Sequence, residues 1–210
     1  MAHFSLLRRA GHITSFFLGE EIDFIRRAAG GKLLVGMGFC QKPLSECPSG
    51  RFNHDCLYFN FKPSWRDIPS PCQGCAIRLF GELALGAGGT LYIMTSALDI
   101  ARDVLIPASD GEFTQAIFCV CPYSMEPISL SALMCGLEGV AIGYAEGACT
   151  DYGQWLRADR GIKEERTFLS EESYALLENI LTAVALARQE TGFPSPSRFK
   201  REGNIYRPIP

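Results

Sequence analysis

Cysteine is the residue type whose abundance in this 210-residue chain most needs a chemical explanation. The chain has nine cysteines but only three histidines. In a reducing compartment, free thiols serve as metal ligands, as catalytic or redox groups, or as small core residues. An odd number also argues against a complete set of disulfide bonds. The positions of the cysteines therefore carry most of the functional information in the sequence.

Four cysteines fall in one irregular stretch that we expect to be a long loop. Two of them form the motif Cys72-Gln-Gly-Cys75, in which a tight turn relaxed by Gly74 lets two thiolates reach one metal ion. The other two complete a candidate set of metal ligands, Cys47, Cys56, Cys72 and Cys75. Such a set suits zinc or an iron–sulfur cluster, although its spacing is not that of a standard zinc ribbon. His54 could replace one thiolate, or be a solvated neighbour.

A second set of thiols lies where the predicted strands end. Cys40 follows the first strand, Cys119 and Cys121 end the third, and Cys149 follows the fourth. The carboxyl ends of parallel strands meet at one edge of the sheet, where open α/β folds bind ligands. We therefore expect these thiols to line a cofactor- or ligand-binding crevice. Burial as ordinary core residues is the alternative.

Polar residues beside these strand ends add to the candidate binding site. Thr95 and Ser96 occupy a strand-to-helix turn whose backbone N–H groups could hold an anion, with a simple helix cap as the alternative. Glu146 and Asp151 flank Cys149, and nearby carboxylates raise the pKa of a thiol instead of activating it. Because no histidine lies near the strand ends, a Cys–His catalytic pair is not expected.

Short apolar strands alternate with helices along most of the chain. The pattern predicts strands at about 32–38, 90–94, 114–120 and 140–145. Caps and apolar stripes predict helices at about 15–29, 76–86, 96–106, 125–137, 151–157 and 171–191. This alternation is typical of a three-layer α/β sandwich, Rossmann-like or flavodoxin-like, with a mainly parallel sheet of about four strands. The cysteine-rich loop follows the first strand.

The chain is expected to form one domain with two unusual segments. Residues 1–192 fit a single α/β domain that carries a cysteine-rich insertion at about 40–75. Residues 193–210 contain four prolines and mixed charge. This composition predicts an extended tail that lies over the surface, or over a second copy of the chain in a homodimer.

Charge and hydropathy exclude several classes of partner. The net charge of −3 leaves no basic surplus to attract nucleic acid. The N-terminal residues lack the apolar core of a secretory signal, and the longest uncharged stretch, Leu83 to Leu98, is too short to span a bilayer. We therefore expect a cytoplasmic protein that binds neither nucleic acid nor membrane.

The order of the cysteine motifs resembles a family of cysteine-rich prokaryotic proteins, a domain of unknown function found mostly in anaerobes. The resemblance covers about residues 38–153. It rests on Cys47-Pro, Cys56, Cys72-x-x-Cys75, Gly88-Gly-Thr-Leu-Tyr-Ile, the strand Ala116-Ile-Phe-Cys-Val-Cys121, a Gly-Val-Ala-Ile strand and Gly147-Ala-Cys149-Thr-Asp151. The resemblance implies a metal or iron–sulfur centre held by such cysteines, and it implies no particular reaction.

Three functions fit these observations. The first is a protein with a cysteine-ligated centre, either an iron–sulfur cluster that transfers electrons to a redox partner protein or a zinc ion. Zinc held by four thiolates would be structural, because no coordination position stays open. The second is a thiol–disulfide redox enzyme or sensor that uses Cys72 and Cys75. The third is a small-molecule binding module whose crevice is lined by thiols.

Overall fold

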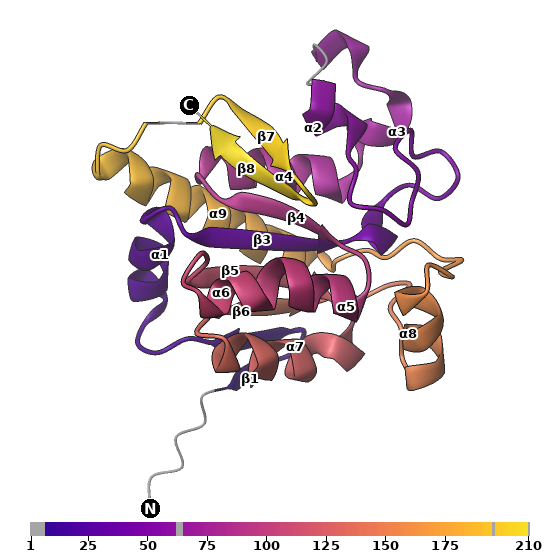
Figure 1. Ribbon diagram of the computed structural model, residues 1–210, viewed down its shortest axis with the longest axis horizontal. Helices are drawn as coiled ribbons and strands as arrows, with labels where there is room; N and C mark the ends of the chain where they lie inside the picture. The colour runs from indigo at the N-terminus through magenta and orange to yellow at the C-terminus, as the bar shows by residue number, and fades with distance from the viewer. Residues whose placement is uncertain (1–6, 62–64, 195, 210) are drawn as a thin grey trace, which may run out of the picture.

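A single eight-stranded sheet organises the molecule, with helices on both faces (Figure 1). The computed structural model describes residues 7–61, 65–194 and 196–209. Within them, the strands lie side by side in the order β1-β2-β6-β5-β3-β4-β8-β7. The non-sequential order means that segments far apart in the chain meet in the sheet.

The centre of the sheet consists of four parallel strands, which correspond to the strands expected from the sequence. β3 (Leu33–Gly38) lies between β4 (Thr90–Met94) and β5 (Gln115–Val120), and β6 (Glu138–Gly143) pairs with the other side of β5. Every residue of β3, β4 and β5 is buried, which explains their continuous apolar character. All four strands end at the same edge of the sheet, on the right in Figure 1.

The prediction of a mainly parallel, four-stranded, Rossmann-like sheet is wrong. Four further strands belong to the sheet, and four of the seven neighbouring strand pairs in the described chain are antiparallel. The hairpin of β1 (Arg8–Ala10) and β2 (Ile13–Phe16) pairs with β6. The hairpin of β7 (Arg198–Glu202) and β8 (Ile205–Ile209) pairs with β4. The fold is therefore a mixed eight-stranded α/β fold.

Local patterns explain why these edge strands form. Burial alternates along β2, so this segment is a half-buried strand where a helix start was predicted. The helix α1 (Glu21–Ala29) begins later, at a capping box formed by Glu20 and Asp23. In β8, Ile205 and Tyr206 are buried against β4. Residues 196–209 thus extend the sheet instead of forming an extended tail.

One face of the sheet is covered by three helices, α1, α4 (Ala76–Gly86) and α9 (Glu171–Glu190) (Figure 1). α4 has the predicted bounds. α9 begins at Ser170, whose side chain accepts the N–H of Ser173, and acidic residues occupy its first turn. An apolar cluster fills the space between these helices and the sheet.

The opposite face carries α5 (Ala97–Ile100), α6 (Ile106–Ser109) and α7 (Pro122–Met134), which pack on a second apolar cluster. A π-helical turn, Ala101–Leu105, joins α5 to α6. Pro107 has no N–H to donate back into the preceding turn, and the wider turn accommodates this missing bond. The predicted single helix is therefore irregular at its centre.

Short elements surround the carboxyl edge of the parallel strands. A 3-10 helix, η1 (Phe39–Gln41), follows β3 directly, and the cysteine-rich loop contains α2 (Leu57–Phe61), a 3-10 turn (Trp65–Asp67) and α3 (Ser70–Gln73). α8 (Tyr152–Asp159) lies at the same edge, below this loop in Figure 1. No helix in the described ranges is both long enough and apolar enough to cross a bilayer.

Candidate functional site

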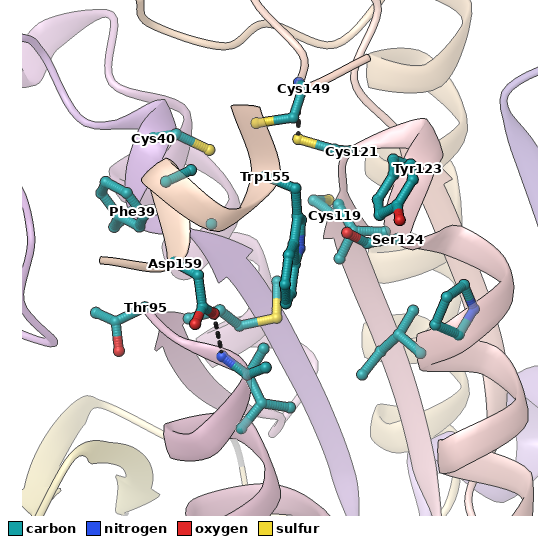
Figure 2. A pocket seen from close by; sticks show the side chains of 18 of the residues that line it. Phe39, Cys40, Thr95, Cys119, Cys121, Tyr123, Ser124, Cys149, Trp155 and Asp159 are labelled. Atoms are coloured by element: carbon teal, nitrogen blue, oxygen red, sulfur yellow. Dashed lines mark hydrogen bonds between the residues drawn. The ribbon is translucent and has the colours of Figure 1, made fainter. Parts of the chain in front are cut away.

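A cavity of about 480 Å³ opens at the carboxyl edge of the parallel strands (Figure 2). The ends of β3, β4 and β5 form its floor, and α5, the π-helical turn, the first half of α7 and α8 form its walls. The lining is predominantly apolar, with side chains such as Met94, Ile100, Leu105, Val120 and Ile128. This size and character are those of sites that bind small organic molecules.

The structure brings together the four thiols expected at the strand ends. Cys40 from η1, Cys119 from β5, Cys121 at the N-cap of α7 and Cys149 before α8 all line the cavity. The sulfurs of Cys40, Cys121 and Cys149 are turned toward one another in Figure 2. All four residues are at most 9% exposed, so the cavity is their route to a ligand.

The two hydroxyl residues that follow β4, Thr95 and Ser96, differ in whether they line the cavity. Thr95 lines the cavity. Ser96 caps α5, because its hydroxyl accepts the N–H of Asp99 at 3.1 Å. Ser96 is not among the residues that line the cavity, so its place in the structure is that of the helix cap.

Cys149 and Cys121 are in direct contact. The backbone N–H of Cys149 donates to Sγ of Cys121 at 3.2 Å. The two side chains also interact by a hydrogen bond between the thiols, which lowers the pKa of Cys149 and raises the pKa of Cys121. The first proton of the pair is therefore lost more easily than that of an isolated thiol, and the second less easily.

Lys163 adds a cation to this thiol pair. It lines the cavity, and its side chain is only 8% exposed. After the hydrogen bond from Cys121, the charge and hydrogen bond of Lys163 also lower the pKa of Cys149. Burial and the carboxylate of Asp151 act in the opposite direction. The expected influence of Asp151 is present, but the two stabilising groups outweigh it.

The other two cavity thiols are held in the neutral form. Burial raises the pKa of Cys119, which is fully inaccessible. Burial also raises the pKa of Cys40, although the Thr167 hydroxyl donates to its sulfur at 3.2 Å and opposes this effect. Cys149 is therefore the thiol of the cavity that is poised to react as a thiolate.

Tyr144 fixes the strand ends beneath the thiols. Its buried hydroxyl accepts the N–H of Gly38 at 3.0 Å and donates to the carbonyl of Cys119. A Cβ on residue 38 would lie 2.6 Å from this hydroxyl, so only glycine fits there. One side chain thus ties β3 and β5 to the chain that leaves β6, and it sets the positions of Cys40 and Cys119.

Three aromatic side chains form the outer wall of the cavity. Tyr152 and Trp155 of α8 stack with ring centroids 5.9 Å apart, and Tyr123 of α7 lies 6.4 Å from Trp155. Asp159, at the end of α8, accepts the N–H of Ala97 at 2.6 Å and so fastens α8 to the start of α5. Sequence reasoning missed this wall, because the only local signal was the aromatic spacing within a short helix.

The four loop cysteines lie apart from the cavity. Cys72 and Cys75 are buried, whereas Cys47 and Cys56 are partly exposed. Within the described residues, no three thiol sulfurs lie within 4.8 Å of one another, so this arrangement has not assembled the predicted metal site. Their residue types suit zinc or an iron–sulfur cluster, but the loop would have to contract to bind either.

A buried cation, Lys42, lies among these loop thiols. Its Nζ donates to the carbonyls of Gly50 and Asn53 and to the Asn53 side chain, at 2.7–3.1 Å. Burial lowers the pKa of Lys42 to about 8, while the nearby Cys47, Cys56 and Cys75 act in the opposite direction. Lys42 is 2% exposed, and no carboxylate is among the groups that shift its pKa.

Hydrogen bonds of two arginines connect the cysteine-rich loop with the segment that follows α8. Arg51 donates to the carbonyls of Cys40, Lys163 and Glu165. Arg166 donates to the carbonyls of Gln41 and Gly74 at 3.0 and 3.1 Å. These bonds join the cysteine-rich loop to the segment that supplies Lys163, which lines the cavity.

His54 does not join the loop thiols as a candidate metal ligand, because its ring is bonded elsewhere. Its Nδ1 lies 2.8 Å from the carbonyl of Ile93, and its Nε2 lies 3.1 Å from the hydroxyl of Thr95. His54, Asp99 and Asp103 have potential ligand atoms within 4.8 Å of one another. Both carboxylates are already bonded to Arg102, so this group is an internal network.

Comparison of the chain with protein-family models, with curated proteins and with solved structures gave no match.

Proposed function

We propose that the protein binds a small, largely apolar molecule in the 480 Å³ cavity and presents it to Cys149 as a nucleophile. The reactive thiol is then in the thiol-lined cavity and not in the Cys72-x-x-Cys75 motif of the loop. The observation that carries this proposal is the environment of Cys149, a buried thiol in contact with Cys121, with the cation of Lys163 nearby, at the edge of an apolar cavity.

The chemistry follows from the charge of the sulfur. The thiolate is the nucleophilic form of cysteine, and a lowered pKa makes it available at neutral pH. Lys163 can also stabilise negative charge that develops on a leaving group beside Cys149. By contrast, burial and the nearby Cys75 and Cys47 raise the pKa of Cys72, so the loop motif lacks this activation at Cys72.

The pH dependence of alkylation tests this proposal. The hydrogen bond with the Cys121 thiol and the charge of Lys163 lower the pKa of Cys149, so its thiolate forms at a lower pH than that of a free thiol. The rate of Cys149 modification by iodoacetamide, followed by peptide mass spectrometry, should rise with pH and reach half of its maximum below the midpoint of about 8.5 that a free thiol has. A midpoint at or above 8.5 would contradict the proposal.

The apolar lining gives a second measurement with an internal control. N-Phenylmaleimide should modify Cys149 faster than N-ethylmaleimide does, because the cavity binds the aromatic ring before reaction. The same ratio at Cys135, which is partly exposed and does not line the cavity, reports the intrinsic reactivities of the two reagents. Equal ratios at the two cysteines would show that the cavity does not select apolar molecules.

The cysteine-ligated centre is our second candidate function, and one observation favours it. Lys42 is a buried cation with no carboxylate partner among the described groups that act on it, and it faces Cys47, Cys56 and Cys75. Buried charges are normally paired, and a centre bound by four thiolates would supply the missing negative charge. A zinc ion there would be a structural clip, and an iron–sulfur cluster would transfer electrons to a redox partner protein.

Metal and acid-labile sulfide analysis of protein purified without air tests this second function. Iron with sulfide, or one equivalent of zinc, is expected in the parent protein and should be lost in Cys72→Ser and Cys75→Ser together with thermal stability. Cys135→Ser is the matched control, because Cys135 lies at the end of α7, outside the loop. Anaerobic protein without metal would exclude the centre and leave the cavity proposal intact.

Both candidate functions require reduced thiols. The nine cysteines are free in the structure, and such a set persists only where the surroundings are reducing. We therefore keep the cytoplasm as the proposed location.

A further inference from the structure

We propose that Cys121 is the resolving partner of Cys149, and that the pair reduces small apolar disulfides by closing a Cys121–Cys149 disulfide beside the cavity. This inference rests on the proposed function of Cys149 and adds a reaction class, a substrate class and a role for the second thiol. Its structural basis is the contact between the two cysteines at the cavity wall (Figure 2).

The geometry places the second thiol where a resolving group must be. Cys121 Sγ accepts the backbone N–H of Cys149 at 3.2 Å, and the two sulfurs lie side by side in Figure 2. Cys121 precedes α7 and Cys149 precedes α8, so each thiol lies just before a helix and not within a strand. Closing the bond therefore requires no change in strand pairing.

The reaction balances without an additional oxidant. The Cys149 thiolate attacks one sulfur of a substrate RSSR, which breaks the S–S bond and releases one RS⁻. Cys121 then loses its proton and attacks Sγ of Cys149, which releases the second RS⁻ and forms the protein disulfide. The substrate gains two electrons from the protein and is released as two thiols, whose two protons come from Cys121 and from solvent. A dithiol reductant, such as a redox partner protein, restores the pair.

The cavity explains why the substrate should be an apolar disulfide. After the first attack, one R group stays attached to Cys149 until Cys121 displaces it. The apolar cavity beside both sulfurs is large enough to hold such a group, and the rings of Trp155 and Tyr123 line its outer side. Lys163 lies where it can stabilise the departing thiolate.

Cys40 is the competing resolving thiol, and the structure favours Cys121. The sulfur of Cys40 accepts a hydrogen bond from Thr167, and its carbonyl is held by Thr167 and Arg51. Hydrogen bonds from two other segments thus hold Cys40 in place, whereas the sulfur of Cys121 accepts a hydrogen bond from the backbone of Cys149 itself. The loop thiols Cys72 and Cys75 do not line the cavity.

A substoichiometric titration with 4,4′-dithiodipyridine, a neutral aromatic disulfide, tests the inference. Each reagent molecule releases one coloured thiopyridone on forming the mixed disulfide and a second one when the protein resolves it. The parent protein should release about two thiopyridones per reagent, and peptide mapping should find Cys121 joined to Cys149. Cys121→Ser should release about one, with the thiopyridyl group retained on Cys149.

Control variants separate this inference from the proposed function. Serine at residue 121 keeps a hydroxyl donor for Cys149, so the first release should stay fast. Cys149→Ser should lose the fast release, whereas Cys135→Ser should behave as the parent. Release of two thiopyridones per reagent by Cys121→Ser, or a Cys40–Cys149 disulfide in the parent protein, would contradict the resolving role of Cys121. Neither result would contradict the role of Cys149 as the nucleophile. Unchanged fast release in Cys149→Ser would overturn both.

Discussion

Cys149 and Cys121 carry the same side chain, but their surroundings shift their acidities in opposite directions. The interaction between the two thiols does both, since it lowers the pKa of Cys149 and raises the pKa of Cys121. Sequence reasoning placed both residues at the sheet edge but could not assign the proton. The acidic neighbours of Cys149 in sequence suggested the wrong direction, because Lys163 and Cys121 approach it only in the folded chain.

Replacing Lys163 by methionine should raise the pKa of Cys149 while keeping the bulk of the side chain. Lys163 lowers this pKa by its charge and by a hydrogen bond, and methionine removes both. At pH values below the pKa, each unit of increase reduces the thiolate fraction about tenfold. Iodoacetamide modification of Cys149 at pH 6.0 should therefore slow several-fold, with a smaller change at pH 9.

Lys200→Met is the matched control for that variant, because Lys200 is exposed on β7. Its modification rate at pH 6.0 should equal that of the parent protein. If the Lys163 variant also kept the parent profile, Lys163 would have no part in activating Cys149.

At the scale of elements, α8 is a weakly anchored part of the cavity wall. None of its residues is buried, and its C-terminal end is held by the bond from the Ala97 N–H to Asp159. Asp159→Ala should free this end and let α8 move away from α5. The rate of Cys149 modification by a bulky pyrenyl maleimide should then rise several-fold, with a smaller effect on the rate for iodoacetamide.

Glu190→Ala, at the exposed end of α9, is the control for this measurement. Circular dichroism of both variants checks that the fold is retained. A rate for the pyrenyl reagent that stays at the parent value in Asp159→Ala would mean that α8 does not control access.

Elements with strong local signals were predicted well, and elements that depend on distant partners were not. The Ser96 and Ser170 caps fix where their helices begin, and the apolar runs of β3 to β6 fix four strands. The segment 13–16 is too short for its alternation to outweigh the adjacent helix signal, and its pairing with β6 is a tertiary contact. The π-helical turn lies inside a pattern that reads as one helix.

At the scale of the whole molecule, the C-terminal hairpin was the largest departure from expectation. Prolines normally exclude a segment from a sheet interior, which is why residues 193–210 were predicted to be a tail. Pro208 is tolerated because β8 pairs with β4 only through Ile205 and Tyr206, so Pro208 faces no strand on that side. The choice of sheet neighbours depends on the folded whole and leaves little trace in a local pattern.

The same scale explains why the cavity was predictable and the loop site was not. The carboxyl ends of parallel strands lie at one edge of the sheet, so the residues at and after these ends lie close together. This arrangement brings Cys40, Cys119, Cys121 and Cys149 to the same cavity. The loop cysteines have no such constraint, since they lie in a segment in which 34 residues separate Cys40 from Cys75 and the described part forms only short helices and turns. Their arrangement depends on Lys42, Arg51 and Arg166, whose bonds no spacing rule foresees.

The position of β8 also sets the order of events during biosynthesis. β4 is translated more than a hundred residues before β8, so the edge of β4 that pairs with β8 has no partner strand while the residues between them are made. Tyr206 of β8 accepts the backbone N–H of Cys56 and donates to Asn60, so the cysteine-rich loop gains these two anchors only when the last strand arrives. Before β8 is in place, the cysteine-rich loop therefore lacks two of the hydrogen bonds that hold it against the sheet.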